Sequence, residues 1–216
     1  MMAASCGPSI PGFTEFGPGV LVMAGHHCPN PKLLLRTTIF VLESGKLLLL
    51  NVGSFAETAV DTWQWLVANR GSFDALLVAN DEHIAYAKST KVAMRVPIWC
   101  SPAAKSKVPC DFVFGESTPP WAGEFSFFTY PSGSSWEYAF FHKRSKIFVT
   151  TGRQLLYCGK LAFQAFGMPN PLSLADIARL QSYGIEFAID GHWDRHYSKT
   201  EFMALLEAAK SDCVSD

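Results

Sequence analysis

The sequence has no long hydrophobic run, no stripe of one charge and no secretory leader pattern. Its longest apolar stretches, such as KLLLLNV and EYAFF, are far too short to cross a bilayer. The N-terminus, MMAASCGPSIPGF, lacks both the basic and the long apolar segment of a signal peptide. The formal net charge is -1, which argues against nucleic acid as the main partner and gives no electrostatic reason to favour a membrane surface.

Cysteines are few and irregularly spaced. None of the six forms a C-x-x-C pair, so the sequence shows no zinc-ribbon pattern. In a chain of 216 residues, we interpret them as free thiols in a reducing compartment. This interpretation predicts a cytoplasmic or other intracellular location. The cysteines are Cys6, Cys28, Cys100, Cys110, Cys158 and Cys213.

What the sequence does contain is a large apolar fraction arranged as strands and helices in a regular order. Hydrophobic residues make up 49% of the chain and charged residues 17%, which is enough to bury a large core. Each half opens with a β meander and continues with helices, which predicts an α/β protein built as a four-layer αββα sandwich. The predicted strands are 19–25, 37–44, 46–53, 74–79, 97–100, 124–130, 137–143, 146–152 and 185–190, the predicted helices are 54–72, 82–94, 173–184 and 198–210, and 101–123 is predicted to be an irregular connection.

Polar side chains follow four of the predicted strands, at the point where each strand ends. In a sandwich of sheets, strand ends that are distant in sequence can meet at one edge, where α/β folds place their chemistry. The clusters are Asn80-Asp81-Glu82-His83, the turn YPSGSSWE with Ser132, the segment TTGRQLLY with Arg153, and IDGHWDRH with His192, Trp193 and Asp194.

This order of elements and strand ends resembles the metallo-β-lactamase superfamily. The segment VANDEHIAYAKS is similar to a divergent branch in which the usual His-x-His-x-Asp-His signature is replaced by something like Thr-Asn-x-x-His. PSGSSWEYAFFHKRSKIFVTTGRQLLYCG and FAIDGHWD resemble that superfamily's later segments. The resemblance runs from about Phe16 to Lys210, and implies an N-terminal extension over 1–15 followed by a single αββα domain over 16–216.

The resemblance also implies which residues would hold zinc, and few of them are present. In the first motif the chain keeps at most Asp81 and His83, and an alternative register places Asn80 and Glu82 at the two leading histidine positions. Neither register gives a full ligand set. A catalytic zinc needs several His or carboxylate donors and an open position for water.

The later ligand positions are altered as well. Pro131 stands where the third-motif histidine is expected, and it has no side chain that can ligate. Arg153 stands where the bridging aspartate is expected, and this permanent cation would repel a second metal. His192 alone keeps its family position. We therefore predict that the dinuclear zinc site is absent.

Three functional hypotheses follow, and we favour the first. In it, the domain carries no cofactor and is a non-hydrolytic binding or scaffolding module, with Arg153 paired to Asp81, Glu82 or Asp190. In the second, one zinc or iron ion is held by His83, His192 and a carboxylate of Asp81 or Asp194. Such a site would hydrolyse an ester, thioester or lactone through metal-bound water.

The third hypothesis is metal-free acid/base chemistry on a small acidic or ester-type substrate, by a hydrolase or lyase. His83 or His192 would transfer the proton, and Arg153 would anchor a carboxylate. Ser132 and Trp193 lie in pocket-forming turns and are predicted to contact a small-molecule ligand. The aromatic residues of STPPWAGEFSFF would suit a homodimer contact if they are exposed.

Overall fold

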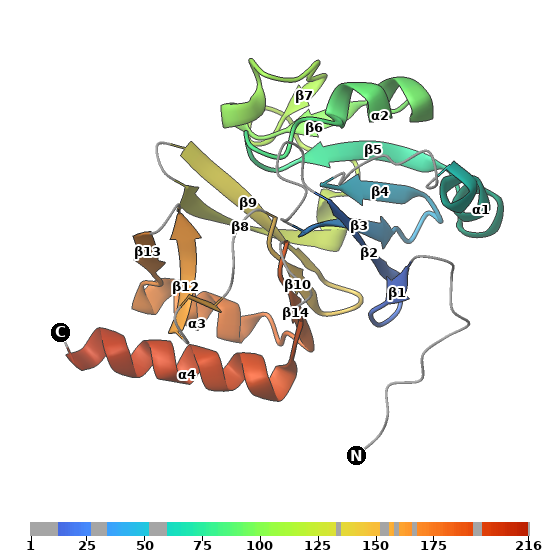
Figure 1. The fold of residues 1–216 in the computed structure, drawn as a ribbon. Coiled ribbons are helices and arrows are strands. Elements are labelled where there is room, and N and C mark those ends of the chain that lie inside the picture. The colour runs from blue at the N-terminus through green and yellow to red at the C-terminus, as the bar shows by residue number, and fades with distance from the viewer. Residues whose placement is uncertain are drawn as a thin grey trace.

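In the computed structural model, two large β-sheets lie face to face, and a pair of helices covers the outer side of each (Figure 1). The order of layers is therefore helices, sheet, sheet, helices, as the sequence predicts. A third sheet of three short strands lies beside the second pair of helices. The structure describes residues 13–26, 34–51, 60–132, 135–151, 156–157, 160–165, 168–191 and 196–215.

The first sheet joins an antiparallel meander to a parallel extension. β1 to β4 pair antiparallel in sequence order, and β4 to β7 pair parallel. Parallel strands need a crossover connection, and two of these carry the helices α1 (Val60–Arg70) and α2 (Ala87–Met94). The strands are β1 (Thr14–Glu15), β2 (Val20–His26), β3 (Leu34–Val41), β4 (Leu47–Leu50), β5 (Phe73–Val78), β6 (Ile98–Cys100) and β7 (Phe112–Val113).

The second sheet has five strands in the order β15-β14-β10-β9-β8, in which β10 and β14 are parallel. Its helices, α3 (Leu174–Ser182) and α4 (Lys199–Ser215), lie on the side away from the first sheet (Figure 1). Each helix is preceded by a serine, Ser173 for α3 and Ser198 for α4, whose hydroxyl accepts a hydrogen bond from the backbone N–H three residues further on. The strands are β8 (Phe125–Ser132), β9 (Ser135–His142), β10 (Ile147–Val149), β14 (Phe187–Ile189) and β15 (His196–Ser198).

The run of four leucines in β4 shows why the sheets are buried on both faces. Leu47 and Leu49 pack toward α1 and α2, whereas Leu48 and Leu50 pack toward the second sheet. A strand between two layers has no solvent-exposed face, so its sequence is a continuous run of apolar residues rather than an alternation of apolar and polar residues. A third core lies between the second sheet and α3 and α4, so three apolar layers separate the four structural layers.

Several local expectations were wrong. The helix predicted from residue 82 begins at Ala87, because residues 80–83 form a turn. The small sheet β11 (Leu156–Tyr157), β12 (Lys160–Ala165) and β13 (Met168–Pro171) was not predicted. The connection 101–123 contains β7 and the 3-10 turn η2 (Pro102–Ala104), and a second 3-10 turn, η3 (Ala122–Glu124), begins at its end. No helix within the described ranges is long and apolar enough to cross a membrane.

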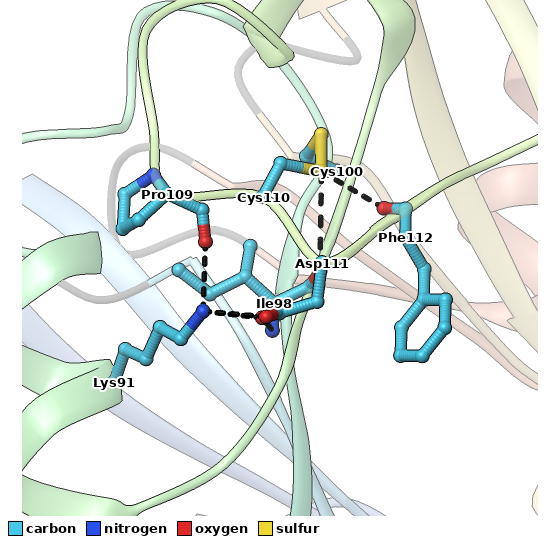
Figure 2. Close-up of polar contacts among 7 residues, drawn as sticks. All are labelled: Lys91, Ile98, Cys100, Pro109, Cys110, Asp111 and Phe112. Atoms are coloured by element: carbon cyan, nitrogen blue, oxygen red, sulfur yellow. Dashed lines mark hydrogen bonds and ion pairs between the residues drawn. A yellow bond between two sulfur atoms is a disulfide. The ribbon is translucent and has the colours of Figure 1, made fainter.

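Two predictions drawn from residue type also need correction. Trp121 and Phe125, from the segment that would suit a homodimer contact if it were exposed, are only 4% and 3% exposed, because they pack into the core between the sheets. Cys100 and Cys110 are not free thiols but form a disulfide (Figure 2). Their Cα atoms lie 6.1 Å apart, within the usual range for a bridge, although they are ten positions apart in the sequence. The intracellular prediction loses this support.

Candidate functional site

The carboxyl ends of β4, β5, β10 and β14 meet at one edge of the sandwich. Parallel pairing brings the ends of neighbouring strands together within each sheet. Hydrogen bonds then join the two sheets across this edge: Asn51 Nδ2 donates to Thr151 O at 2.6 Å, and Tyr138 N donates to Ala79 O at 3.2 Å. The predicted gathering of strand ends is therefore present in the described part of the chain.

Asn80, the first residue of the cluster after β5, is fully buried at this edge. Its Oδ1 accepts from the backbone N–H groups of His83 at 2.9 Å and Glu82 at 3.2 Å. This Asx turn fixes which side-chain atom is oxygen, because only an acceptor can face two N–H groups. Nδ2 therefore points the other way, and lies 3.3 Å from Glu137 Oε2 and 3.2 Å from His83 Nδ1. The two acceptor positions of Oδ1 and the two N–H groups of Nδ2 all have partners, so the hydrogen-bonding capacity of the amide is fully used.

The tautomer of His83 follows from this arrangement. The amide nitrogen of Asn80 can only donate, so the contact at Nδ1 requires an unprotonated Nδ1 and places the ring proton on Nε2. In that form the lone pair of Nδ1 is engaged by Asn80, and Nε2 carries hydrogen. A metal ligand needs a nitrogen lone pair directed at the ion, and in this form neither ring nitrogen of His83 offers one.

Glu137 is the second centre of the network, and its side chain is fully buried in β9. Tyr130 OH donates to Oε2 at 3.0 Å, in addition to the bond from Asn80. Thr151 Oγ1 lies 3.4 Å from the same oxygen and 3.0 Å from Tyr138 O, and its one proton can serve either acceptor. A buried carboxylate is tolerated only when such donors replace water.

Asp81 lies next to this network but points to a cation. Its Oδ2 is 2.6 Å from Lys107 Nζ, in the connection between β6 and β7. The Asp81 side chain is 24% exposed and that of Lys107 is 47% exposed, so solvent screens the pair. The counter-charge at Asp81 is thus Lys107, a residue that sequence reasoning did not consider.

The other predicted site residues are placed as follows. Glu82 is partly buried within the Asx turn. The backbone of Ser132 ends β8, where it pairs with Ser135. Asp190 is buried after β14 and accepts from Tyr197 OH at 3.3 Å. Four predicted residues lie outside the described residues: Arg153, His192, Trp193 and Asp194.

Two of the predicted zinc ligands, His83 and Asp81, lie within the described residues. His83 has its Nδ1 engaged by Asn80, and the Asp81 carboxylate is paired with Lys107. Within the described ranges, no group of three or more His, Cys, Asp or Glu side chains could hold a metal ion. The ligand set that the family resemblance implies therefore disagrees with the geometry of His83 and Asp81.

Sequence reasoning missed Glu137, although a signal for it exists. In β9, Glu137 alternates with Ala139 and Phe141, which are buried against α3 and α4. A carboxylate in the register of a buried apolar face is a strong indication of a buried polar network. Lys107 had no comparable signal, because a lysine in a polar connection is usually solvated.

A cavity of about 530 Å³ lies elsewhere in the fold. It is lined by α1, the beginning of β5 and the end of α2, with Val67, Phe73 and Met94 among its residues. Phe73 is the first residue of β5, whereas Asn80 follows its last. The cavity is therefore at the opposite end of the strand from the polar network.

Comparisons with known proteins agree with the architecture. The DIM-1 metallo-β-lactamase superposes with a TM-score of 0.65 and 13% sequence identity, over 94% of this chain and 96% of that one. A metallo-β-lactamase from Hirschia baltica superposes with a TM-score of 0.65 and 10% identity, over 91% of this chain and 96% of that one. A β-lactamase domain protein from Burkholderia ambifaria superposes with a TM-score of 0.59 and 13% identity, over 95% of this chain and 74% of that one. No protein-family model and no curated protein sequence matches the chain. The chain thus has a divergent metallo-β-lactamase fold, and identities this low indicate the fold alone.

Proposed function

We propose that this chain is a non-hydrolytic binding or scaffolding module built on the metallo-β-lactamase fold. In this proposal a fixed polar network, formed by Asn80, His83, Glu137, Tyr130 and Thr151, occupies the strand-end edge where the family resemblance implies a metal centre. No cofactor is required.

The observation that carries the proposal is the saturation of Asn80. Its four hydrogen-bonding positions are directed at Glu82, His83 and Glu137, all within the protein. To bind a metal through Nδ1, or through Nε2 after its proton moves to Nδ1, His83 would have to give up the Asn80 contact. That would leave a buried N–H of Asn80 without its acceptor, which costs about 1–3 kcal/mol. The network therefore favours a structural role for His83.

The Asp81–Lys107 pair supports the same proposal. A metal ion placed at Asp81 would have to displace an ammonium group that lies 2.6 Å from the carboxylate. The ammonium group of Lys107 offsets the charge of the Asp81 carboxylate, so Asp81 attracts a cation less than an isolated aspartate would.

The proposal can be tested with the full-length chain after zinc or iron reconstitution. Hydrolysis of a chromogenic ester, a thioester, a lactone and a β-lactam would be compared between wild type and His83→Ala. We expect the wild-type rate to equal that of the buffer with metal alone, and the variant to be the same.

Turnover by the wild type that disappears in His83→Ala would contradict the proposal. If that turnover required added metal, it would support the single-metal hydrolase, and if it persisted with a chelator, it would support the acid/base enzyme.

The ligand of the module is proposed to be a small molecule rather than nucleic acid or a membrane. An intracellular location and a homodimer remain predictions of the sequence.

A further inference from the structure

The connection between β6 and β7 is closed at its base by the Cys100–Cys110 disulfide. Cys100 is the last residue of β6 and is completely buried, whereas Cys110 is partly exposed. The bridge therefore fixes residues 101–109 as a closed loop on the end of the sheet. Such a cross-link removes conformational freedom that the open connection would have.

The far stem of this loop is held independently of the bridge (Figure 2). Lys91 Nζ lies 2.6 Å from Asp111 Oδ2, and it also donates to Pro109 O at 3.0 Å. Ile98 N donates to Asp111 Oδ2 at 2.8 Å. Opening the disulfide would therefore remove the covalent closure of the loop while β7 stays attached to β6. The loop would then be held by the bonds of Ser101 N to Val78 O and of Lys91 to Pro109 O, and by the exposed Lys105–Glu116 pair.

The loop carries Lys107, the cation paired with Asp81. Between the two cysteines, the backbone is held mainly by short-range bonds, such as Lys107 N to Ala104 O at 2.9 Å. The covalent closure at Cys100 and Cys110 thus limits how far this part of the loop can carry Lys107 away from Asp81. Asp81 in turn directly follows Asn80, the centre of the polar network.

We propose that Cys100–Cys110 is a thiol-exchange site whose reduction releases Lys107 from Asp81. The reactant is a dithiol reductant, either a small molecule or a protein dithiol. This goes beyond the proposed function and does not depend on it, because the release of Asp81 is measured without any assay of hydrolysis or metal binding.

The exchange proceeds through the sulfur of Cys110, the partly exposed residue of the pair. A thiolate of the reductant attacks Cys110 Sγ and forms a mixed disulfide, and Cys100 leaves and takes up a proton. The second thiol of the reductant attacks the mixed disulfide, which frees Cys110 as a thiol and leaves the reductant as a disulfide. Two electrons and two protons pass from the reductant to the cysteine pair. The freed Cys110 Sγ is 2.9 Å from Phe112 O, so its S–H has an acceptor in place.

Carbodiimide labelling of carboxylates in the folded, full-length chain tests the proposal. Oxidised protein and protein reduced with dithiothreitol would be compared by mass spectrometry, with alkylation of Cys100 and Cys110 as proof of reduction. We expect labelling of Asp81 to rise at least threefold on reduction. Asp74 is the matched control, because its ion pair with Lys46 has nearly the same exposure (22% against 24% for the aspartates) but lies outside the loop.

Two variants sharpen the test. In Lys107→Gln, labelling of Asp81 should equal that of the reduced wild type, both with and without reductant. In Cys110→Ser, labelling of Asp81 should reach the same level without reductant. If Cys110→Ser does not fold, the wild-type comparison still decides the question. Equal Asp81 labelling in the oxidised and the fully reduced wild type would overturn the proposal, as would an equal rise at Asp74. Full alkylation of both cysteines before reduction of air-oxidised protein would overturn it as well.

Discussion

Asn80, in the turn after a strand of the first sheet, and Glu137, in the second sheet, are joined by a hydrogen bond of 3.3 Å from Nδ2 to Oε2. Asn80 follows the end of β5, and Glu137 lies near the beginning of β9. The bond closes the sandwich at the edge where the fold gathers its strand ends. Since both side chains are fully buried, the pair should contribute to stability more than any exposed ion pair of the protein does.

Glu137→Gln should lower the free energy of unfolding by about 2–4 kcal/mol, because it replaces a charged acceptor and introduces a buried amide N–H group. Urea denaturation at neutral pH measures this. Glu116→Gln is the control: Glu116 pairs with Lys105 at 2.9 Å, but both side chains are more than half exposed. That change should cost less than about 1 kcal/mol. Equal losses in the two variants would rule out a special role for Glu137.

Asn80→Asp separates the two functions of the Asn80 side chain. The variant keeps an oxygen for the Asx turn but replaces Nδ2, so a second carboxylate would face Glu137. We expect a loss of about 2–4 kcal/mol at neutral pH, with part of it recovered in acid as one carboxyl of the pair is protonated. Denaturant titrations at several pH values test this.

Asn69→Asp is the control for this charge change. Asn69 Nδ2 donates to Trp65 O at 2.7 Å on the exposed surface of α1. The Asn69→Asp variant should lose less than about 1 kcal/mol of unfolding free energy. If Asn80→Asp proved as stable as Asn69→Asp at neutral pH, the orientation assigned to the Asn80 amide would be wrong.

Gly191→Ala should destabilise the fold severely. A Cβ on Gly191 would overlap the backbone carbonyl of Thr151, and Gly191 also accepts from Arg36 N at 2.9 Å. Because the obstacle is backbone rather than a flexible side chain, we expect a loss of about 3 kcal/mol or more, or failure to fold. Gly123→Ala meets no atom within 4 Å and should change the unfolding free energy by less than about 0.5 kcal/mol. Thermal melts that do not distinguish the variants would contradict the packing at Gly191.

His142 predicts a loss of stability in mild acid. Burial, aided by the nearby Arg144, lowers the pKa of His142 from 6.5 to about 4. The unfolded chain therefore takes up a proton that the folded chain does not, as the pH falls from about 6.5 to about 4. This group's contribution should decrease by up to about 1.4 kcal/mol per pH unit across that window.

The measurement is the pH dependence of the unfolding free energy in wild type and His142→Gln. The variant should have the shallower slope between about pH 4 and pH 6.5, because glutamine does not titrate. Identical slopes would show that His142 is not the buried neutral group inferred from its position in the core, 5.1 Å from the ring of Phe125.

The layers of the fold could be predicted from the sequence, because apolar runs and helix caps such as Ser173 are local signals. The site could be predicted only in part, because its contacts are not local. Asn80 was recognised as a polar strand end, but its partner Glu137 is 57 residues away. The same holds for Lys107, which is 26 residues from Asp81, and for Cys100 and Cys110, which pair across a loop without a C-x-x-C motif. The predicted start of α2 was wrong because the side chain of Asn80 accepts hydrogen bonds from the backbone N–H groups of Glu82 and His83. These residues therefore form a turn, and the helix begins only at Ala87.

The most direct test of the central claim is the metal stoichiometry of the full-length, tag-free chain. Elemental analysis after incubation with zinc, iron or manganese and removal of the unbound ion measures it. With His83 Nδ1 engaged by Asn80 and Asp81 paired with Lys107, we predict less than about a tenth of an equivalent of any metal per chain. About one equivalent of bound metal that is lost in His83→Ala would contradict the account.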